Sequence, residues 1–164
     1  MAIKVAVNRA LTAITALPTA AALTDGNLTL LTTATASSSA TLSFTSNINS
    51  TYNSYLFKFI DIHAGTDSVQ LTFNMSIDTG SNYNVTKTTT AFYAEQDEAS
   101  TATSLAYNTS RDLAQSTAFQ TIFMNVGSDN DQCNVGFLHL FDPSSTTFVK
   151  HFITIGSEYQ AGDY

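Results

Sequence analysis

The residues with the most obvious capacity for chemistry are Asp78-Thr-Gly-Ser81, which follow the apolar stretch Met75-Ser-Ile77. This pattern is found around the catalytic carboxylate of aspartic proteases, where two such aspartates share a proton and activate a water. One copy per chain would require a homodimer, and Thr154-Ile-Gly156 only poorly resembles the second element of such enzymes. The same four residues also make a good hairpin turn. We therefore interpret residues 78–81 as a turn and expect no catalytic residue.

Metal chemistry has little support in the sequence. The histidines His63, His139 and His151 lie far apart, with none of the short spacings that zinc sites use, so we interpret them as core or edge residues. Asp129-Asn-Asp131 could offer oxygens to calcium but lacks the other ligands of a calcium loop, so we interpret it as a turn. No serine lies in a Gly-x-Ser-x-Gly motif. The sequence predicts no enzyme, no metal and no cofactor.

Aromatic residues are the remaining candidates for a binding site. Four tyrosines could form a platform on which the sugar rings of a host surface glycan stack, and the alternative is that they are ordinary packing residues of a β-protein. They are Tyr52, Tyr55, Tyr83 and Tyr93.

The elements that would position these residues are strands. In residues 69–77, Val69, Leu71 and Phe73 alternate with polar residues, which is typical of a half-buried antiparallel strand. Residues 55–62 form a similar strand, and the turn-forming stretch 63–68 joins the two.

The rest of the chain repeats the order of strand and turn. Strands are expected at residues 28–33, 40–45 and 83–95, and later at 119–126, 133–141 and 147–155. Residues 96–118 are polar and weakly patterned, which indicates a long loop with a short helix near residues 112–118. About eight strands with regular turns predict an antiparallel β-sandwich, jelly-roll-like, over residues 25–164.

Residues 1–24 look like an arm rather than part of the sandwich. Three residues alternate as a short strand, and three more fall on one side of a helical turn that ends at Pro18. These apolar residues are expected to dock on the sandwich, a sister subunit or a larger assembly: Ile3, Val5, Val7, Leu11, Ile14 and Leu17. No apolar stretch reaches the roughly 20 residues that a membrane span requires.

Charge and cysteine content narrow the classes of partner. The net charge of −7 and the pI near 4.5 argue against nucleic acid, since only six lysines and arginines are present and they are scattered. Cys133 is the single cysteine, so an intrachain disulfide is excluded, and we expect it to be a small buried hydrophobic residue.

Several stretches of the chain resemble a group of virion structural proteins from marine bacteriophages, including those of cyanobacteria and pelagic bacteria. They are residues 44–63, 78–90, 112–120 and especially Leu138-His-Leu-Phe-Asp-Pro-Ser-Ser-Thr-Thr-Phe-Val-Lys-His-Phe152. The resemblance covers most of residues 28–160. It implies a structural or tail-fibre-like role, carries no catalytic residue, and favours the loop interpretation of residues 78–84.

From the resemblance we expect a non-enzymatic virion protein, assembled in the host bacterial cytoplasm. A tail fibre or tail-appendage subunit is the first expectation, because an anchoring arm followed by a sandwich suits a projecting element. A capsid decoration protein and a host-glycan-binding module are the alternatives. The expected partners are other copies of the chain and other virion proteins.

Overall fold

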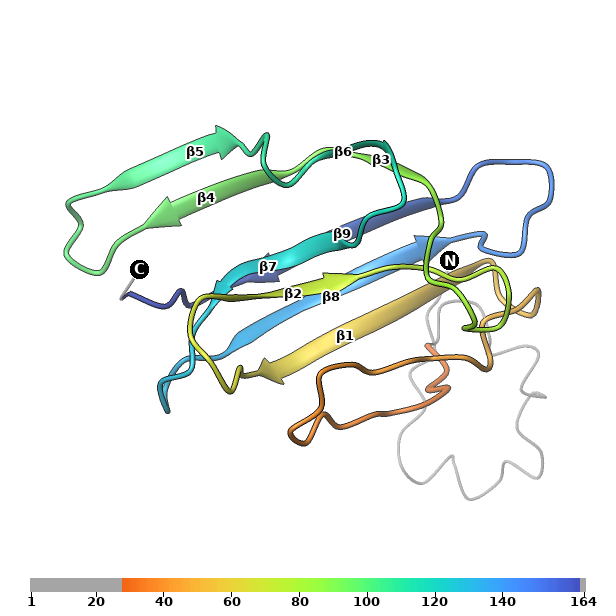
Figure 1. Ribbon diagram of the computed structural model, residues 1–164, viewed down its shortest axis with the longest axis horizontal. Coiled ribbons are helices and arrows are strands. Elements are labelled where there is room, and N and C mark those ends of the chain that lie inside the picture. Colours follow the sequence, from red (N-terminus) through yellow and green to blue (C-terminus); the bar gives the residue numbers. More distant parts are fainter. Residues whose placement is uncertain (1–27, 163–164) are drawn as a thin grey trace, which may run out of the picture. The chain divides into compact units, whose positions relative to one another are not determined.

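The computed structural model describes residues 28–162. The chain divides into two units, residues 1–35 and 36–164. Of the first unit, residues 28–35 are described, and they contain neither helix nor strand. The expected arm at residues 1–24, with Ile3, Val5, Val7, Leu11, Ile14 and Leu17, lies outside the described residues. In residues 36–162 all regular structure is β-strand (Figure 1), so the expected all-β class is confirmed for this part of the chain.

Nine strands make four small antiparallel sheets in the described residues. The largest has the order β1-β8-β9, and the pairs β2-β7, β3-β6 and β4-β5 make the others. The strands are β1 Ser54–Ile62, β2 Val69–Phe73, β3 Lys87–Thr89, β4 Phe92–Gln96, β5 Thr103–Tyr107, β6 Leu113–Ser116, β7 Gln120–Val126, β8 Asn134–Phe141 and β9 His151–Ser157.

Several strand expectations are confirmed and others are wrong. β1, β7 and β8 lie where the alternating patterns place them. β2 ends at Phe73, four residues earlier than expected, and β9 begins four residues later than expected. The expected strand at residues 83–95 is divided into β3 and β4, and the expected loop at residues 96–118 contains β5 and β6. Residues 28–33 and 40–45 were expected as strands but form none. The expected helix at residues 112–118 is also wrong, since β6 lies there. Its Leu113 amide donates to the Thr89 hydroxyl of β3 at 3.0 Å, which ties this segment to a neighbouring strand.

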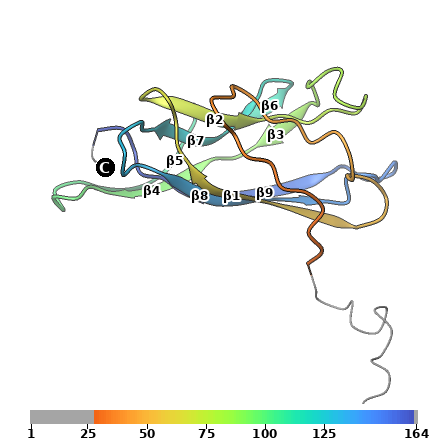
Figure 2. The ribbon, with the colours of Figure 1, turned by 90° about the horizontal axis from the view of Figure 1, so that it is seen from below.

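Two pairs join strands that follow each other along the chain, β4-β5 and β8-β9, but β1 and β2 do not pair with each other. β1 and β2 belong to different sheets, because β1 pairs with β8 and β2 pairs with β7. The three-stranded sheet and the β2-β7 pair lie in two layers (Figure 2). Edge-to-face aromatic contacts join them: the ring centroids of Phe59 and Phe123 are 6.1 Å apart, and those of Phe73 and Phe152 are 5.0 Å apart.

The core lies between these two layers. Tyr55, Leu138 and Leu140 are buried at its centre, and the partly buried residues around them are Phe57, Phe59, Phe73, Met75 and Phe152. Residues before β1 add to this cluster, since the ring of Phe44 contacts that of Phe57 edge-on with centroids 5.6 Å apart. Burial of these rings supplies the main favourable term for folding.

The chain after β9 connects one layer to the other. Both oxygens of the Glu158 carboxylate accept hydrogen bonds from β7 amides, at 2.7 Å from Met124 N and 2.9 Å from Asn125 N. Gln160 then forms a β-bridge with Val126 of β7. This link joins the layers on one side. No strand pairing joins the four sheets of the described residues to one another, so they do not make one closed sandwich.

Candidate assembly surface

The three-stranded sheet is apolar on both faces. Tyr55, Phe57 and Phe59 of β1 point toward the core, so alternation places Leu56, Lys58 and Ile60 on the opposite face. The same alternation on β8 and β9 extends this opposite face across the sheet. We call it the outer face. Its central positions are Leu56, Lys58, Ile60, Val135, Phe137, His139, Ile153 and Ile155, and its ends are Ser54, Phe141, His151 and Ser157.

The strand register arranges the outer face in rows. Leu56 pairs with His139, which pairs with Ile153, and Lys58 pairs with Phe137, which pairs with Ile155. Opposed residues of this kind lie about 4.5–5.5 Å apart, so each row is a continuous strip of side chains.

Water reaches a large part of this apolar surface. Ile60 is 68% exposed, Ile153 is 53% exposed and Ile155 is 58% exposed. Antiparallel sheets with one face in water usually carry polar residues there, and contiguous exposed apolar patches mark interaction sites. No position of the outer face carries a carboxylate, although the chain has 13 acidic residues and a net charge of −7.

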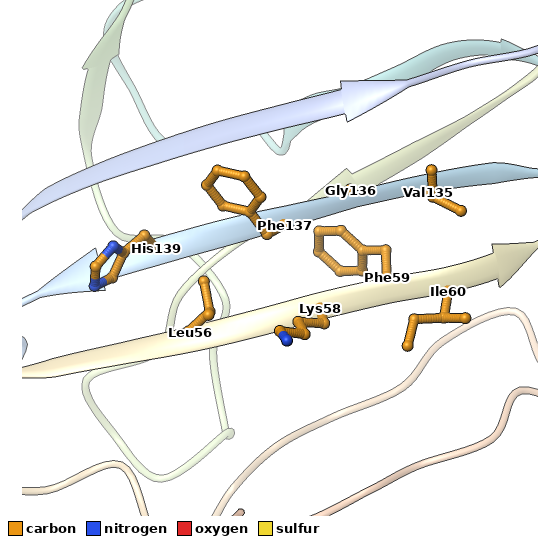
Figure 3. Close-up of a pocket in the computed structure, with 8 residues that line it drawn as sticks. All are labelled: Leu56, Lys58, Phe59, Ile60, Val135, Gly136, Phe137 and His139. Atoms are coloured by element: carbon orange, nitrogen blue, oxygen red, sulfur yellow. The ribbon is translucent and has the colours of Figure 1, made fainter. Parts of the chain in front are cut away.

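A shallow depression runs along the outer face between β1 and β8 (Figure 3). Leu56 and Ile60 lie on the β1 side, Val135 and Phe137 lie on the β8 side, and the Lys58 and His139 side chains are its polar members. Because these strands cover one side of the core, the depression is held on a rigid sheet rather than on a loop.

The Asp78 turn has the structure that the turn interpretation predicts. Its carboxylate accepts hydrogen bonds from Ser76 Oγ at 2.6 Å, Asn82 N at 2.8 Å and Asn82 Nδ2 at 2.6 Å. Thr79 and Gly80 have the positive φ values of a tight turn, 58° and 88°. The turn is not part of a hairpin, because the strands on either side pair elsewhere, β2 with β7 and β3 with β6. The Ser76 hydroxyl, and then Asn82, lower the pKa of Asp78 to about 2. A carboxyl with this pKa stays ionised at neutral pH, so it is a poor proton donor.

The histidines and the acidic turn are not brought together. One ring nitrogen of His63 lies 2.8 Å from the Gln132 carbonyl oxygen, while the His139 ring stacks on Phe141 with centroids 4.0 Å apart. The backbone carbonyl oxygen of Asp129 accepts a hydrogen bond from Gln132 N at 2.9 Å in a turn, as expected. Within residues 28–162, no group of histidine, cysteine and acidic residues is placed to hold a metal ion, and no helix is long and apolar enough to cross a membrane.

The four tyrosines do not form a single cluster. Tyr52 and Tyr55 are in edge-on contact with ring centroids 6.0 Å apart. Tyr55 is buried, and its hydroxyl donates to the Asn49 carbonyl oxygen at 2.7 Å, whereas Tyr52 is partly exposed. Tyr83 lies against the Gly80 turn, and Tyr93 lies on β4, in another sheet.

The expectation for Cys133 is wrong, because this residue is exposed. Its neighbours Gln132 and Asn134 are buried instead. The Asn134 amide nitrogen donates to the Ile62 carbonyl at 3.3 Å, and its amide oxygen accepts from Tyr159 N at 3.1 Å. Alternation along the chain therefore turns the intervening cysteine outward, since the two amides satisfy backbone groups inside.

Sequence reasoning missed the outer face. Its signal was present in β1, where Leu56 and Ile60 make the strand apolar on both sides, unlike the alternating β2. Comparisons with known proteins add no family: no family model matches the chain, and no curated protein or solved structure matches it.

Proposed function

We propose that this protein is a non-enzymatic structural subunit of a bacteriophage virion and that it self-assembles through the outer face. The first role that we propose within the virion is that of a tail fibre or tail-appendage subunit. The carboxylate-free apolar outer face on an acidic chain carries this proposal. The resemblance of residues 28–160 to marine phage virion proteins supports the virion assignment. The all-β structure also suits a projecting subunit, but proteins with many other functions are all-β as well.

A second copy of the chain is the partner that the charge distribution favours. Two molecules of net charge −7 repel each other, and the repulsion is weakest when the surfaces that meet carry no carboxylate. The outer face is such a surface. Exposed Ile60 and Ile155 of one copy would bury against the same surface of another, as in an isologous contact.

The size of the face predicts a weak contact for each pair. Three strands about 4.8 Å apart and about 17–20 Å long cover roughly 300 Å² of sheet, whereas a stable interface buries about 800 Å² on each partner. Repetition in an array compensates, because linked weak contacts give high avidity. Assembly would therefore be strong on a particle and concentration-dependent in solution.

We further propose that the two layers form part of a jelly-roll-like sandwich, preceded by a docking arm at residues 1–24. The aromatic contacts between the layers and the Glu158 link to β7 support this arrangement. In a fibre or shell, neighbouring subunits would cover the sheet edges that pairing within the chain leaves open.

Location on a particle tests the virion assignment. Antibody to the purified protein, detected with gold, should label the tail of intact particles in electron micrographs. Label spread over the capsid would replace the tail assignment by the decoration alternative, and particles that contain none of the protein by mass spectrometry would contradict the virion proposal.

A further inference from the structure

A buried lysine contacts a side-chain amide in a polar part of the interior. Lys87, the first residue of β3, is only 5% exposed. Its Nζ donates to Asn74 Oδ1 at 2.6 Å and to the Val85 carbonyl oxygen at 2.8 Å. Both acceptors are neutral, so these hydrogen bonds bring no opposite charge to the ammonium form. Burial of a lysine without a nearby negative charge disfavours its ammonium form.

The Asn74 amide is held on every side. Its Oδ1 also accepts the Met75 amide at 2.8 Å, while its Nδ2 donates to the carbonyl oxygens of Tyr83 at 2.7 Å and Thr117 at 2.9 Å. These contacts come from chain segments before β3 and after β6, so they fix the amide plane relative to the strand that carries Lys87. An amine and an amide carbonyl are thereby kept adjacent in one orientation.

We propose that Lys87 and Asn74 form an intramolecular isopeptide bond spontaneously, without an enzyme. The neutral Nζ donates its lone pair to Asn74 Cγ, and the C=O electrons move to Oδ1. One proton then passes from Nζ to Nδ2, the Cγ–Nδ2 bond breaks, ammonia leaves and the C=O bond re-forms. The products are one secondary amide and one ammonia, and no oxidant or cofactor is consumed.

Three features of the site favour this reaction over hydrolysis or no reaction. Desolvation lowers the pKa of Lys87, which raises the fraction of neutral amine. The Met75 N–H already contacts Oδ1 and remains there when that oxygen becomes negative. The close, fixed approach replaces an encounter between separate groups, and such orientation is worth up to about 7–11 kcal/mol in well-aligned cases.

The product also fits the site. The amide nitrogen formed from Nζ keeps one hydrogen, which can continue to donate to the Val85 carbonyl oxygen. A neutral amide then replaces a buried cation, which removes the desolvation cost of the lysine. The bond closes a covalent loop across 13 residues, from the segment after β2 to β3. This inference does not depend on the proposed virion function.

Trypsin digestion followed by mass spectrometry tests the proposal on the full-length protein. Trypsin cuts after lysine and arginine, and the unmodified chain gives peptides 59–87 and 88–111 from this region. An acylated Lys87 is not cleaved. The cross-linked protein should therefore give one peptide, 59–111, that is lighter than its sequence by one ammonia, and the denatured intact chain should show the same loss.

Matched variants separate the cross-link from other losses of ammonia. Lys87→Met and Asn74→Ala should each abolish the mass loss, whereas Lys150→Met, which removes an exposed lysine just before β9, should retain it. Cyclisation of Asn74 onto its own backbone would also release ammonia but would leave Lys87 cleavable, and that result would overturn the proposal. A wild-type chain with the full sequence mass after long incubation in mildly alkaline buffer would overturn it as well. Both decisive measurements use the wild-type protein, so they stand even if a variant fails to fold.

Discussion

Gly156 of β9 lies directly against the ring of Phe123 on β7, so closely that a Cβ at Gly156 would overlap the ring. Phe123 is the largest apolar side chain that is fully buried in the described residues. Gly156 pairs with Gly136 of β8, and a Cβ at Gly136 would lie 3.2 Å from the ring of Phe123. Two glycines that are opposite each other thus leave one layer smooth where an aromatic ring of the other layer packs.

Alanine at Gly156 is therefore expected to destabilise the fold. The added methyl must displace Phe123 or separate the layers, and overpacking of this kind costs about 1–3 kcal/mol. Denaturant unfolding of Gly156→Ala should show a lower midpoint with an unchanged slope. Gly65→Ala is the matched control, because nothing lies within 4 Å of a Cβ at that loop position, and its effect should stay within about 0.5 kcal/mol. Equal effects of the two changes would contradict this packing.

Acid should weaken the turn at residues 78–82. The pKa of Asp78 is lowered from 3.8 to about 2 by hydrogen bonds that form only in the folded chain. Its contribution is therefore fully present above about pH 4 and is lost as the pH falls toward 2. Asp78→Asn should make the unfolding free energy less dependent on pH in this window. A variant whose acid profile matched that of the wild type would show that the carboxylate bonds contribute nothing.

The Glu158 carboxylate is expected to stabilise the link between the layers. In Glu158→Gln one acceptor oxygen is replaced by an NH₂ group that faces a backbone N–H of β7, so one of the two bonds is lost. The loss of a hydrogen bond to a charged group costs about 1.5–3 kcal/mol. Thermal unfolding should detect it, with Glu95→Gln on the exposed surface of β4 as the control. If both variants melt together with the wild type, the link is not a stabilising element.

Sequence patterns over a few neighbouring residues predicted much of this fold, whereas the pairing of strands that are far apart in the chain could not be predicted. Alternation placed β2 and β7 because it depends on residues two apart, and Asp-Thr-Gly-Ser predicted a turn from local φ preferences. The partnership of β1 with β8 joins residues about 80 positions apart, and composition carries no signal of it. Local polarity also misled at residues 112–118, where side chains of β3 bind the backbone of β6.

The outer face was more predictable from the sequence than the contact between Lys87 and Asn74, for the same reason. The outer face could have been found from the two apolar faces of β1, once β8 and β9 were known to continue it. Nothing in the sequence placed Lys87 beside Asn74, because the contact depends on how the loop between β2 and β3 folds back. The wrong expectation for Cys133 has a related cause, since the inward position after it is held by the Asn134 amide, whose backbone partners Ile62 and Tyr159 are distant in the sequence.

Self-association through the outer face is the central claim, and sedimentation equilibrium over a range of micromolar concentrations tests it most directly. The wild type should show a weight-average mass that rises with concentration above that of the 17.6 kDa chain. The double variant Ile153→Thr/Ile155→Thr keeps β-branched residues on β9 but removes apolar surface, so it should remain near the monomer mass. The control Ile77→Thr/Leu105→Thr changes residues that are 89% and 83% exposed outside this face, and it should associate like the wild type. A wild type that stays monomeric at every concentration, or a β9 variant that associates equally well, would contradict the claim.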